Sequence, residues 1–386
     1  MTRQSAVDRH GEKRVRVSLF SEDAATAELE ARSRDRRVGW TLLALTLFGV
    51  VALAILPSPY VIERPGPVFD TLDAVSVDGE DVPLIDIPTE PTYDTPGSLA
   101  LLTVNVVGNR DSRPSWFDVL QAWIDPTQAV VPVDSVFPEG VSTEDRREQS
   151  RVDMQNSQRE AVAAALRALG EPYESSLVVV ESMQAGPAEG VLEPDDVIVS
   201  VNGTAVRDVT ALRELISVNG TGGPAEFLIV RGGAEQTALI TPVLSDGQDR
   251  VPIIGVLVAG EYEFPFEVEI ELSNVGGPSA GMMFALGIVD KLTPGSLAGG
   301  AEVAGTGTIA ADGAVGPIGG IQQKMYGAVD FGADWFLAPA ANCGEVVGAV
   351  PDGLEVFSVA TLDDAIVVLQ TIADEGDLDA LPRCDA

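Results

Sequence analysis

Ser279 and Lys324 are the residues whose types and surroundings could perform acyl-transfer chemistry. Ser279 lies in the glycine-rich run 276–281 (GGPSAG), and Lys324 comes 45 residues later, shortly after a second such run, 316–320 (GPIGG). The only histidine, His10, precedes an apolar segment near the N-terminus. A serine nucleophile therefore has no imidazole base here, and a lysine must take the proton, as in Ser-Lys hydrolases.

Lysine is rare in this chain, which makes the position of Lys324 informative. Of the 24 Lys and Arg residues only three are lysines, namely Lys13, Lys291 and Lys324. Arginine stays protonated and cannot act as a base, whereas burial can lower the pKa of a lysine towards neutrality. The alternative is a surface lysine on an amphipathic helix, and its position alone leaves both interpretations open.

Both residues are predicted to lie on helices that follow glycines. One helix is predicted from Pro278 to about Leu292, and another over 320–331 with Gly332 ending it. A serine at a helix start lies beside free backbone N–H groups, which can stabilise an oxyanion. The candidate oxyanion and substrate-backbone positions are Gly277, Pro278 and Ala280.

The surrounding region, residues 252–372, alternates predicted strands and helices, which indicates a layered α/β or α+β domain. Residues 266–272 alternate strictly and predict a strand with its glutamates facing solvent. Further strands are predicted over 303–309, before a hairpin turn at 312–313, and over 335–338. No histidine accompanies the glutamates and no Cys/His spacing fits zinc, so no metal site is predicted.

Composition limits the classes of function. The net charge of −35 argues against nucleic-acid binding, because phosphate contacts need basic patches. With 386 residues and 45% hydrophobic content, the chain can form two or three domains with real cores.

Residues 38–56 contain 19 residues without a charge, about the length that spans a bilayer core. Four arginines precede them: Arg32, Arg34, Arg36 and Arg37. The positive-inside rule then predicts a cytoplasmic tail (1–37), a single-pass anchor, and everything after residue 57 outside the cytoplasm. The alternatives are a cleaved signal peptide and a buried soluble helix.

The two cysteines, Cys343 and Cys384, both lie on the predicted outer side. An oxidising compartment permits a disulfide. We expect one that ties the C-terminal tail, 373–386, to the last domain.

Residues 57–174 are predicted to form an N-terminal region that ends in a helix. Its proline-rich part, 57–140, has a best strand over Ser98–Val107, and no function can be assigned to it from sequence. Ser142 with Asp145 resembles a capping box that would start the helix, and Gly170 with Pro172 would end it.

Residues 175–245 are predicted to form a compact unit of strands with one helix, 210–217. The run GPAEGVLEPDDVIVSVNGTAV, followed by this helix, resembles bacterial PDZ domains. That resemblance implies peptide capture in a groove between a strand near 177–182 and the helix. The implied groove residues are Leu177, Val178, Val179, Leu212, Leu215 and Ile216, and the alternative is a structural spacer.

Two stretches match phosphate-binding loop motifs in part, but the residues that follow them do not fit such a loop. Residues 305–310 match G-x-G-x-x-A but run into an Asp-Gly turn instead of a helix. Residues 316–324 lack a Lys-Ser or Lys-Thr after the glycine. We therefore predict no nucleotide cofactor and no ATPase module.

The stretch 277–345 resembles the proteolytic domain of Lon proteases. The agreement runs through residues 277–281 (GPSAG), 302–307 (EVAGTG), 315–320 (VGPIGG), Lys324, and 336–339 (FLAP) with Asn342. The resemblance implies that Ser279 is the nucleophile, Lys324 the general base, and Thr306 the residue that orients the lysine. The resemblance also suggests a ring-shaped homo-oligomer as a candidate assembly. The chain departs from many Lon enzymes at Gly276 and Thr308, where those enzymes have acidic residues.

The predicted fold class is α+β multidomain, with an N-terminal transmembrane helix, a PDZ domain and a Lon-type α/β proteolytic domain. This order resembles a bacterial family of membrane-bound PDZ-containing serine peptidases. The expected function is ATP-independent cleavage of unfolded or partner polypeptides outside the cytoplasm. The alternative is a non-catalytic PDZ adaptor that uses the Lon-like fold as a scaffold.

Overall fold

A computed structural model describes residues 38–51, 53, 55–77, 79–137, 143–245, 250–272 and 275–384. The predicted tail 1–37, with His10 and the four arginines, lies outside the described residues, as does Ser142 of the predicted cap. The chain divides into two units, Met1–Ser58 with Ser115–Asp118, and Pro59–Pro114 with Val119–Ala386.

In the first unit, residues 38–51 are helical and carry exposed apolar side chains, such as Phe48. The backbone N–H of Trp116 donates to the carbonyl of Leu56 at 3.3 Å. Across the described residues, no helix combines the length and apolarity needed to cross a membrane. Two positions of the anchor predicted over residues 38–56, residues 52 and 54, lie outside the described part of the chain.

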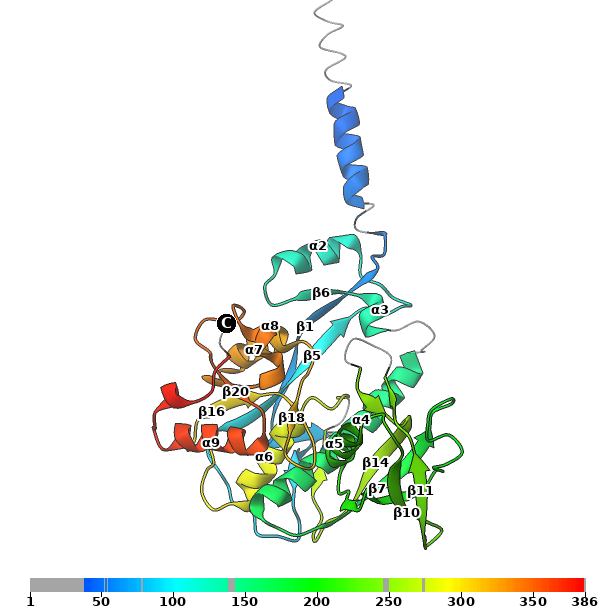
Figure 1. Ribbon diagram of the computed structural model, residues 1–386. Helices are drawn as coiled ribbons and strands as arrows, with labels where there is room; N and C mark the ends of the chain where they lie inside the picture. The colour runs from blue at the N-terminus through cyan, green and yellow to red at the C-terminus, as the bar shows by residue number, and fades with distance from the viewer. Residues whose placement is uncertain are drawn as a thin grey trace, which may run out of the picture. The chain divides into compact units, whose positions relative to one another are not determined.

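The second unit is built on a six-stranded sheet in the order β20-β19-β16-β5-β1-β6 (Figure 1). The strands are β1 (Tyr60–Asp70), β5 (Ser98–Val107), β6 (Ala129–Pro132), β16 (Glu302–Gly305), β19 (Trp335–Pro339) and β20 (Glu355–Val359). Strands β1 and β6 are antiparallel to their neighbours, whereas β16, β19 and β20 continue from β5 in parallel.

This sheet corrects the predicted domain boundaries. Residues 57–174 do not form a separate region, because β1, β5 and β6 complete the sheet of the Lon-like domain predicted over 252–372. The first five residues of β5 are all buried, as expected for a strand covered on both faces. Such a strand needs neighbours on both sides, and sequence could not identify β16 as one of them.

Alternate residues of β5 point into two cores. Leu99 and Leu101 pack in a cluster with α4 (Thr143–Leu169), α6 (Gly281–Leu292) and α9 (Leu362–Ala373). Ala100 and Leu102 pack on the other face, with α7 (Ile321–Phe331) and α8 (Cys343–Val346). The sheet therefore has helices on both faces. Short helices outside the PDZ-like part are α2 (Trp116–Ile124), α3 (Val133–Val136), η1 (Ala340–Asn342) and η2 (Leu378–Ala380).

A second sheet, in the order β11-β10-β8-β7-β14 with β9 beside β8, forms the PDZ-like part. Its strands are β7 (Glu174–Ser182), β8 (Val197–Val201), β9 (Thr204–Ala205), β10 (Ala225–Arg231), β11 (Ala234–Ile240) and β14 (Val256–Glu263). Helix α5 (Val209–Asn219) is capped by Asp208, whose side chain accepts from the N–H of Ala211 at 2.7 Å. Since β14 pairs with β7, this part extends past the predicted end at residue 245. It is inserted between strands of the larger sheet.

Four two-stranded pairings complete the fold: β2 (Ala74–Val77) with β3 (Glu80–Pro83), β4 (Ile85–Asp86) with β15 (Glu269–Ile270), β12 (Val243–Leu244) with β13 (Pro252–Ile253), and β17 (Thr308–Ile309) with β18 (Val315–Gly316).

The strand predicted over 266–272 was wrong in length, since only β15 forms, opposite the equally short β4. Its glutamates are exposed, as predicted. The strand predicted over 303–309 is split between β16 and β17 at Thr306 and Gly307. There the backbone N–H of Gly307 turns to donate to the carbonyl of Ser279 at 2.9 Å.

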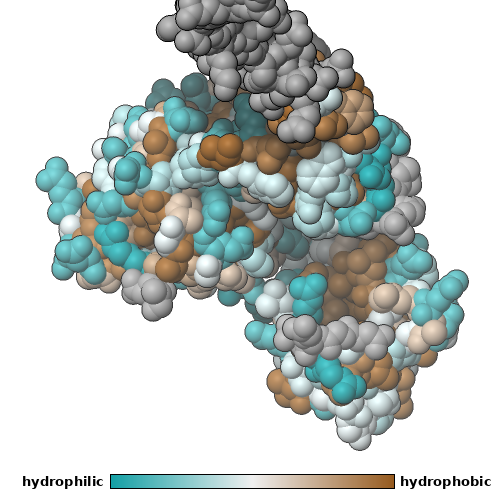
Figure 2. All heavy atoms as spheres, turned by 90° about the horizontal axis from the view of Figure 1, so that it is seen from above, coloured by the Kyte–Doolittle hydropathy of each residue, from teal (hydrophilic) through white to brown (hydrophobic). Residues whose placement is uncertain are grey.

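Cys343 and Cys384 are joined in a disulfide, with their Cα atoms 4.9 Å apart. The bond ties the C-terminal segment to α8, and Cys384 packs against the core cluster that contains residues of α7 and α8. On the face of the molecule seen in Figure 2, hydrophilic side chains cover much of the surface and hydrophobic ones form separate patches.

Candidate active site

Ser279 is held in a tight turn between the six-stranded sheet and α4. Gly277 has a positive φ of 89°, a conformation that favours glycine, and its N–H donates to the carbonyl of Ser150 on α4 at 3.0 Å. A Cβ on Gly276 would lie 2.8 Å from the Cβ of Ser150. The two glycines therefore allow the serine turn to approach α4 closely.

The helix after this turn begins three residues later than predicted. Helix α6 begins at Gly281 with Ala280 as its N-cap, so Pro278 and Ser279 lie before the helix. The carbonyl of Pro278 accepts from the Ser157 hydroxyl at 3.0 Å and from the N–H of Gly281 at 3.3 Å. Ser279 thus stays at the N-terminal end of α6, where helix N–H groups favour negative charge.

Lys324 approaches Ser279 from the first turn of α7 and is only 2% exposed. Its Nζ lies 2.9 Å from the Oγ of Ser279 and 2.8 Å from the Oγ1 of Thr306. The start of α7 depends on Gly320, whose φ is +67° and whose added Cβ would lie 2.7 Å from Val104 of β5. A larger residue there would push the lysine away from the serine.

Thr306 is fully buried and connects the two other residues. Its hydroxyl donates to the carbonyl of Ser279 at 3.0 Å, so towards Lys324 it can only accept. This arrangement directs one N–H of the amine to Thr306, which leaves the nitrogen lone pair of a neutral amine available to Ser279.

Burial lowers the pKa of Lys324 to about 7. Removal from water disfavours the charged ammonium, and no carboxylate is among the described residues that line the surrounding pocket. The amine is therefore available as a base near neutral pH.

The pocket at Ser279 has a volume of about 270 Å³. It is lined by the edge of β5 and by the serine turn, with Met154 of α4 and Gly319 closing it. Within the described part of the chain, no group of His, Cys, Asp and Glu residues could hold a metal ion.

Sequence reasoning gave no role to several residues that shape this site. Asn342 is buried, accepts from the N–H of Ile318 at 3.0 Å, and donates to the carbonyl of Ile318 at 2.9 Å. It thereby fixes the turn that leads into α7. Ser150 and Ser157 hold the serine turn from α4, and nothing in the local pattern of that helix marks them.

Residues 274–371 match the family model of the Lon protease (S16) C-terminal proteolytic domain. The chain carries a Lon-type serine endopeptidase domain. Similar relatives include a Lon protease of Azospirillum brasilense, 39% identical over 93 residues, and Lon protease 1 of Sorangium cellulosum, 38% identical over 93 residues. In each case the alignment spans 23% of this chain but only 11% of the relative. Lon protease 2 of Bacillus subtilis is 27% identical over 161 residues, or 41% of this chain and 28% of that protein.

Residues 178–231 match a PDZ domain model, so a PDZ domain accompanies the Lon-type domain. A solved PDZ domain from the SdrC-like protein of Listeria innocua is 20% identical, with a TM-score of 0.20, and covers 22% of this chain and 92% of its own.

The predicted peptide groove of the PDZ domain needs correction. Strand β7 has a partner on each side, β8 and β14, so it cannot accept a further strand. Of the six predicted groove residues, Leu177, Val179, Leu212 and Ile216 are buried in the core of the PDZ domain, while Leu215 packs against it from the surface. Val178 pairs with both Val197 and Ala259. The outer strand on this side of the sheet is β14, which sequence reasoning assigned to the next domain.

Proposed function

We propose that this chain is an ATP-independent endopeptidase that uses a Ser279–Lys324 dyad to cleave unfolded polypeptides. The observation that carries the proposal is the contact of a buried lysine amine with both Ser279 Oγ and Thr306 Oγ1. A non-catalytic scaffold would have no need to bury a lysine whose pKa is lowered to about 7. This burial favours the enzyme over the adaptor interpretation.

The proposed mechanism follows from these positions. The neutral amine of Lys324 takes the hydroxyl proton as Ser279 Oγ attacks the substrate carbonyl, and the resulting ammonium returns the proton to the leaving amine. Water then attacks the acyl-serine, with Lys324 again accepting a proton and Ser279 regaining it. The N–H groups near Ala280, at the N-terminus of α6, would stabilise the oxyanion.

Strand β5 offers a place for an extended substrate. Strand β16 pairs with β5 only as far as Leu101, and among the described residues no strand pairs with residues 102–107 on that side. Leu102, Thr103 and Val104 line the pocket of Ser279. A substrate strand could therefore add to β5 beyond the end of β16 and bring a peptide bond to the serine. Only unfolded segments can adopt this extended form, and no ATP-driven unfolding is needed for them.

Hydrolysis of an unfolded protein without ATP tests this proposal. The full chain should degrade casein at a rate that ATP and magnesium do not change, because substrate already unfolded needs no motor. Gel-based time courses with and without ATP, alongside a folded protein of similar size, provide the measurement. Degradation that depends on added ATP would contradict the proposal, and an absence of degradation with both substrates would favour the adaptor alternative.

We further propose that the PDZ domain presents polypeptides through the edge of β14 and the facing helix α5. Val256 and Val258 of β14, with Val209 and Leu215 of α5, are partly buried apolar residues around the PDZ core. In the chain, β14 is followed by β15, which pairs with β4 of the catalytic domain, so a peptide held on β14 would lie on a segment connected to that domain.

A location outside the cytoplasm, with residues 38–56 as an anchor, is also a proposal. It is supported by the uncharged 19-residue run, the preceding arginines and the Cys343–Cys384 disulfide, which an oxidising compartment favours. Membrane-impermeant thiol labelling of intact cells after reduction tests it. In a chain whose Cys343 and Cys384 are both replaced by Ser, single cysteines introduced at Ser5 and at Ser217 should be protected and labelled, respectively, and the reverse pattern would exclude the orientation.

A further inference from the structure

A pocket lined by arginines adjoins the pocket of Ser279. It has a volume of about 640 Å³, and Val275 and Gly276 belong to the lining of both pockets. The same two elements contribute to both pockets. Strand β5 contributes Leu102–Val104 to the first and Val106 to the second, while α4 contributes Met154 to the first and Ser150 to the second. The two pockets are therefore successive parts of one cleft that follows β5 and α4.

The second pocket differs in charge from the rest of the chain. Three arginines of α4 line it, namely Arg146, Arg147 and Arg151, and no acidic residue is among the described residues of its lining. In a chain of net charge −35 this concentration is unusual. The guanidinium of Arg146 lies 4.9 Å from the centre of the Phe137 ring, and Arg151 forms an ion pair with Glu148. The ring contact helps to fix the direction of Arg146.

We propose that this arginine pocket is a substrate subsite that selects an acidic side chain a few residues from the cleaved bond. The inference rests on the proposed peptidase function. Guanidinium groups form strong, directional hydrogen bonds with carboxylates, and a cleft with low-dielectric walls strengthens them. A strand rises about 3.3 Å per residue, so a substrate lying along β5 would reach the pocket about two to five residues from the serine.

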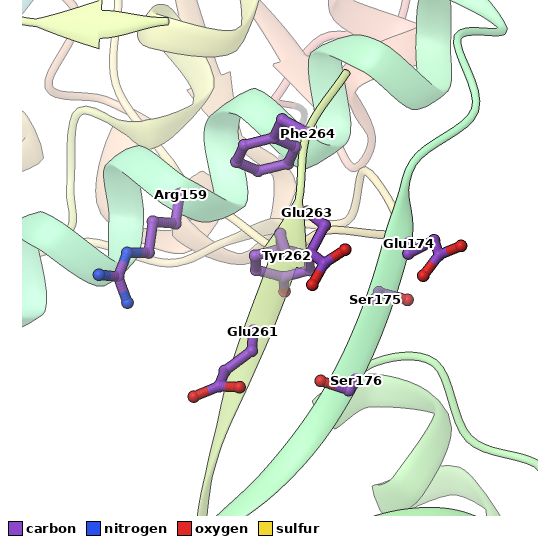
Figure 3. A pocket seen from close by; sticks show the side chains of 8 residues that line it. All are labelled: Arg159, Glu174, Ser175, Ser176, Glu261, Tyr262, Glu263 and Phe264. Carbon is purple, nitrogen blue, oxygen red and sulfur yellow. The ribbon is translucent and has the colours of Figure 1, made fainter. Parts of the chain in front are cut away.

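A pocket on the same helix provides the matched control. Arg159 of α4 lines a separate pocket of about 490 Å³ together with residues of β7 and β14, as Figure 3 shows. Glu174, Glu261 and Glu263 line the same pocket, so it is not a purely basic one. A substitution of Arg159 therefore changes the charge of α4 by the same amount as the corresponding substitution of Arg146, but it leaves the arginine pocket unaltered.

The test measures kcat/KM for quenched fluorescent peptides that carry Glu, Gln or Lys at single positions two to five residues on either side of the cleaved bond. Both ends are blocked, so the substituted side chain is the only variable charge. We expect the wild type to prefer Glu over Lys by about tenfold at one or two adjacent positions, less so at high salt. Arg146→Glu should abolish or invert the ratio, Arg146→Gln should reduce it, and Arg159→Glu should leave it unchanged.

The outcomes separate the subsite from the peptidase function itself. Cleavage of all peptides with equal kcat/KM by the wild type would overturn the subsite while leaving the peptidase intact. A Glu preference that survives in both Arg146 variants, or that Arg159→Glu removes equally, would overturn it too. If no peptide is cleaved by the wild type under conditions in which it degrades casein, the cleft along β5 is not the substrate path. Circular dichroism of each variant excludes misfolding as the cause.

Discussion

Lys324→Ala should lower kcat for peptide hydrolysis by about a thousandfold or more, and Ser279→Ala should lower it to a similar residual level. Without the amine, the Ser279 hydroxyl keeps its proton at neutral pH and is a poor nucleophile. Without the hydroxyl, the amine has no group to activate. Because the two residues act as one unit, the double variant should lose little more than either single variant. Initial rates with a fluorescent peptide and casein provide the measurement.

Matched substitutions elsewhere in the chain control for loss of folding. Lys291 of α6 donates to the carbonyl of Leu72 at 3.3 Å and lies outside the pocket of Ser279, so Lys291→Ala should retain activity. Ser217 is exposed on α5, so Ser217→Ala is the matched control for Ser279→Ala and should also retain activity. If Lys324→Ala kept more than about a tenth of the wild-type kcat, a lysine base would be excluded, because general-base removal costs at least about a hundredfold.

Activity should also fall steeply with acid. Only the neutral amine of Lys324 can accept the proton of Ser279, and burial places its pKa at about 7. Above that pH most molecules hold the neutral amine, and kcat/KM should be flat. Below it, the neutral fraction falls about tenfold per pH unit, so kcat/KM at pH 5 should be about a hundredfold lower than at pH 9. Measurement of kcat/KM from pH 5 to pH 9 reports the pKa in the free enzyme.

Two controls keep this profile interpretable. Far-ultraviolet circular dichroism at each pH shows whether the loss of activity precedes any loss of structure. Lys324→Arg should show no rise in activity anywhere in this range, since a guanidinium keeps its proton. A kcat/KM that still rises about tenfold per pH unit between pH 8 and pH 9 would mean that the pKa lies near the ordinary lysine value, about 10.4, and that the amine is not desolvated as the structure indicates.

The chemistry of the site was largely readable from the sequence. With no histidine after His10 and three lysines in all, few bases were available to a serine, and the glycine-rich surroundings of Ser279 and Lys324 distinguished them from surface residues. Local patterns also predicted several elements closely. The strand over Ser98–Val107 matches β5, and the helix predicted over 210–217 lies within α5. These signals depend on residue type and short-range periodicity, which a linear sequence contains in full.

The assembly of the domains was not readable in this way. Ser98 pairs with Glu302 across 204 positions, and no local pattern encodes that partner or its register. For the same reason sequence reasoning assigned β14 to the catalytic domain and the peptide groove to β7. Which strand lies at the edge of a sheet follows from long-range backbone pairing and not from its own residues.

The candidate reactive groups, Ser279, Lys324 and Thr306, could be proposed from residue identity and local pattern, because their chemistry belongs to their side chains. Three features of the site become visible only in the folded chain: Lys324 is buried, α4 holds the serine turn, and β5 continues past β16 as an open edge. The pKa of the base and the path of a substrate depend on what lies around these groups in space. That environment comes from segments that are far apart in the sequence, such as α4 and the serine turn, and they come together only when the chain folds.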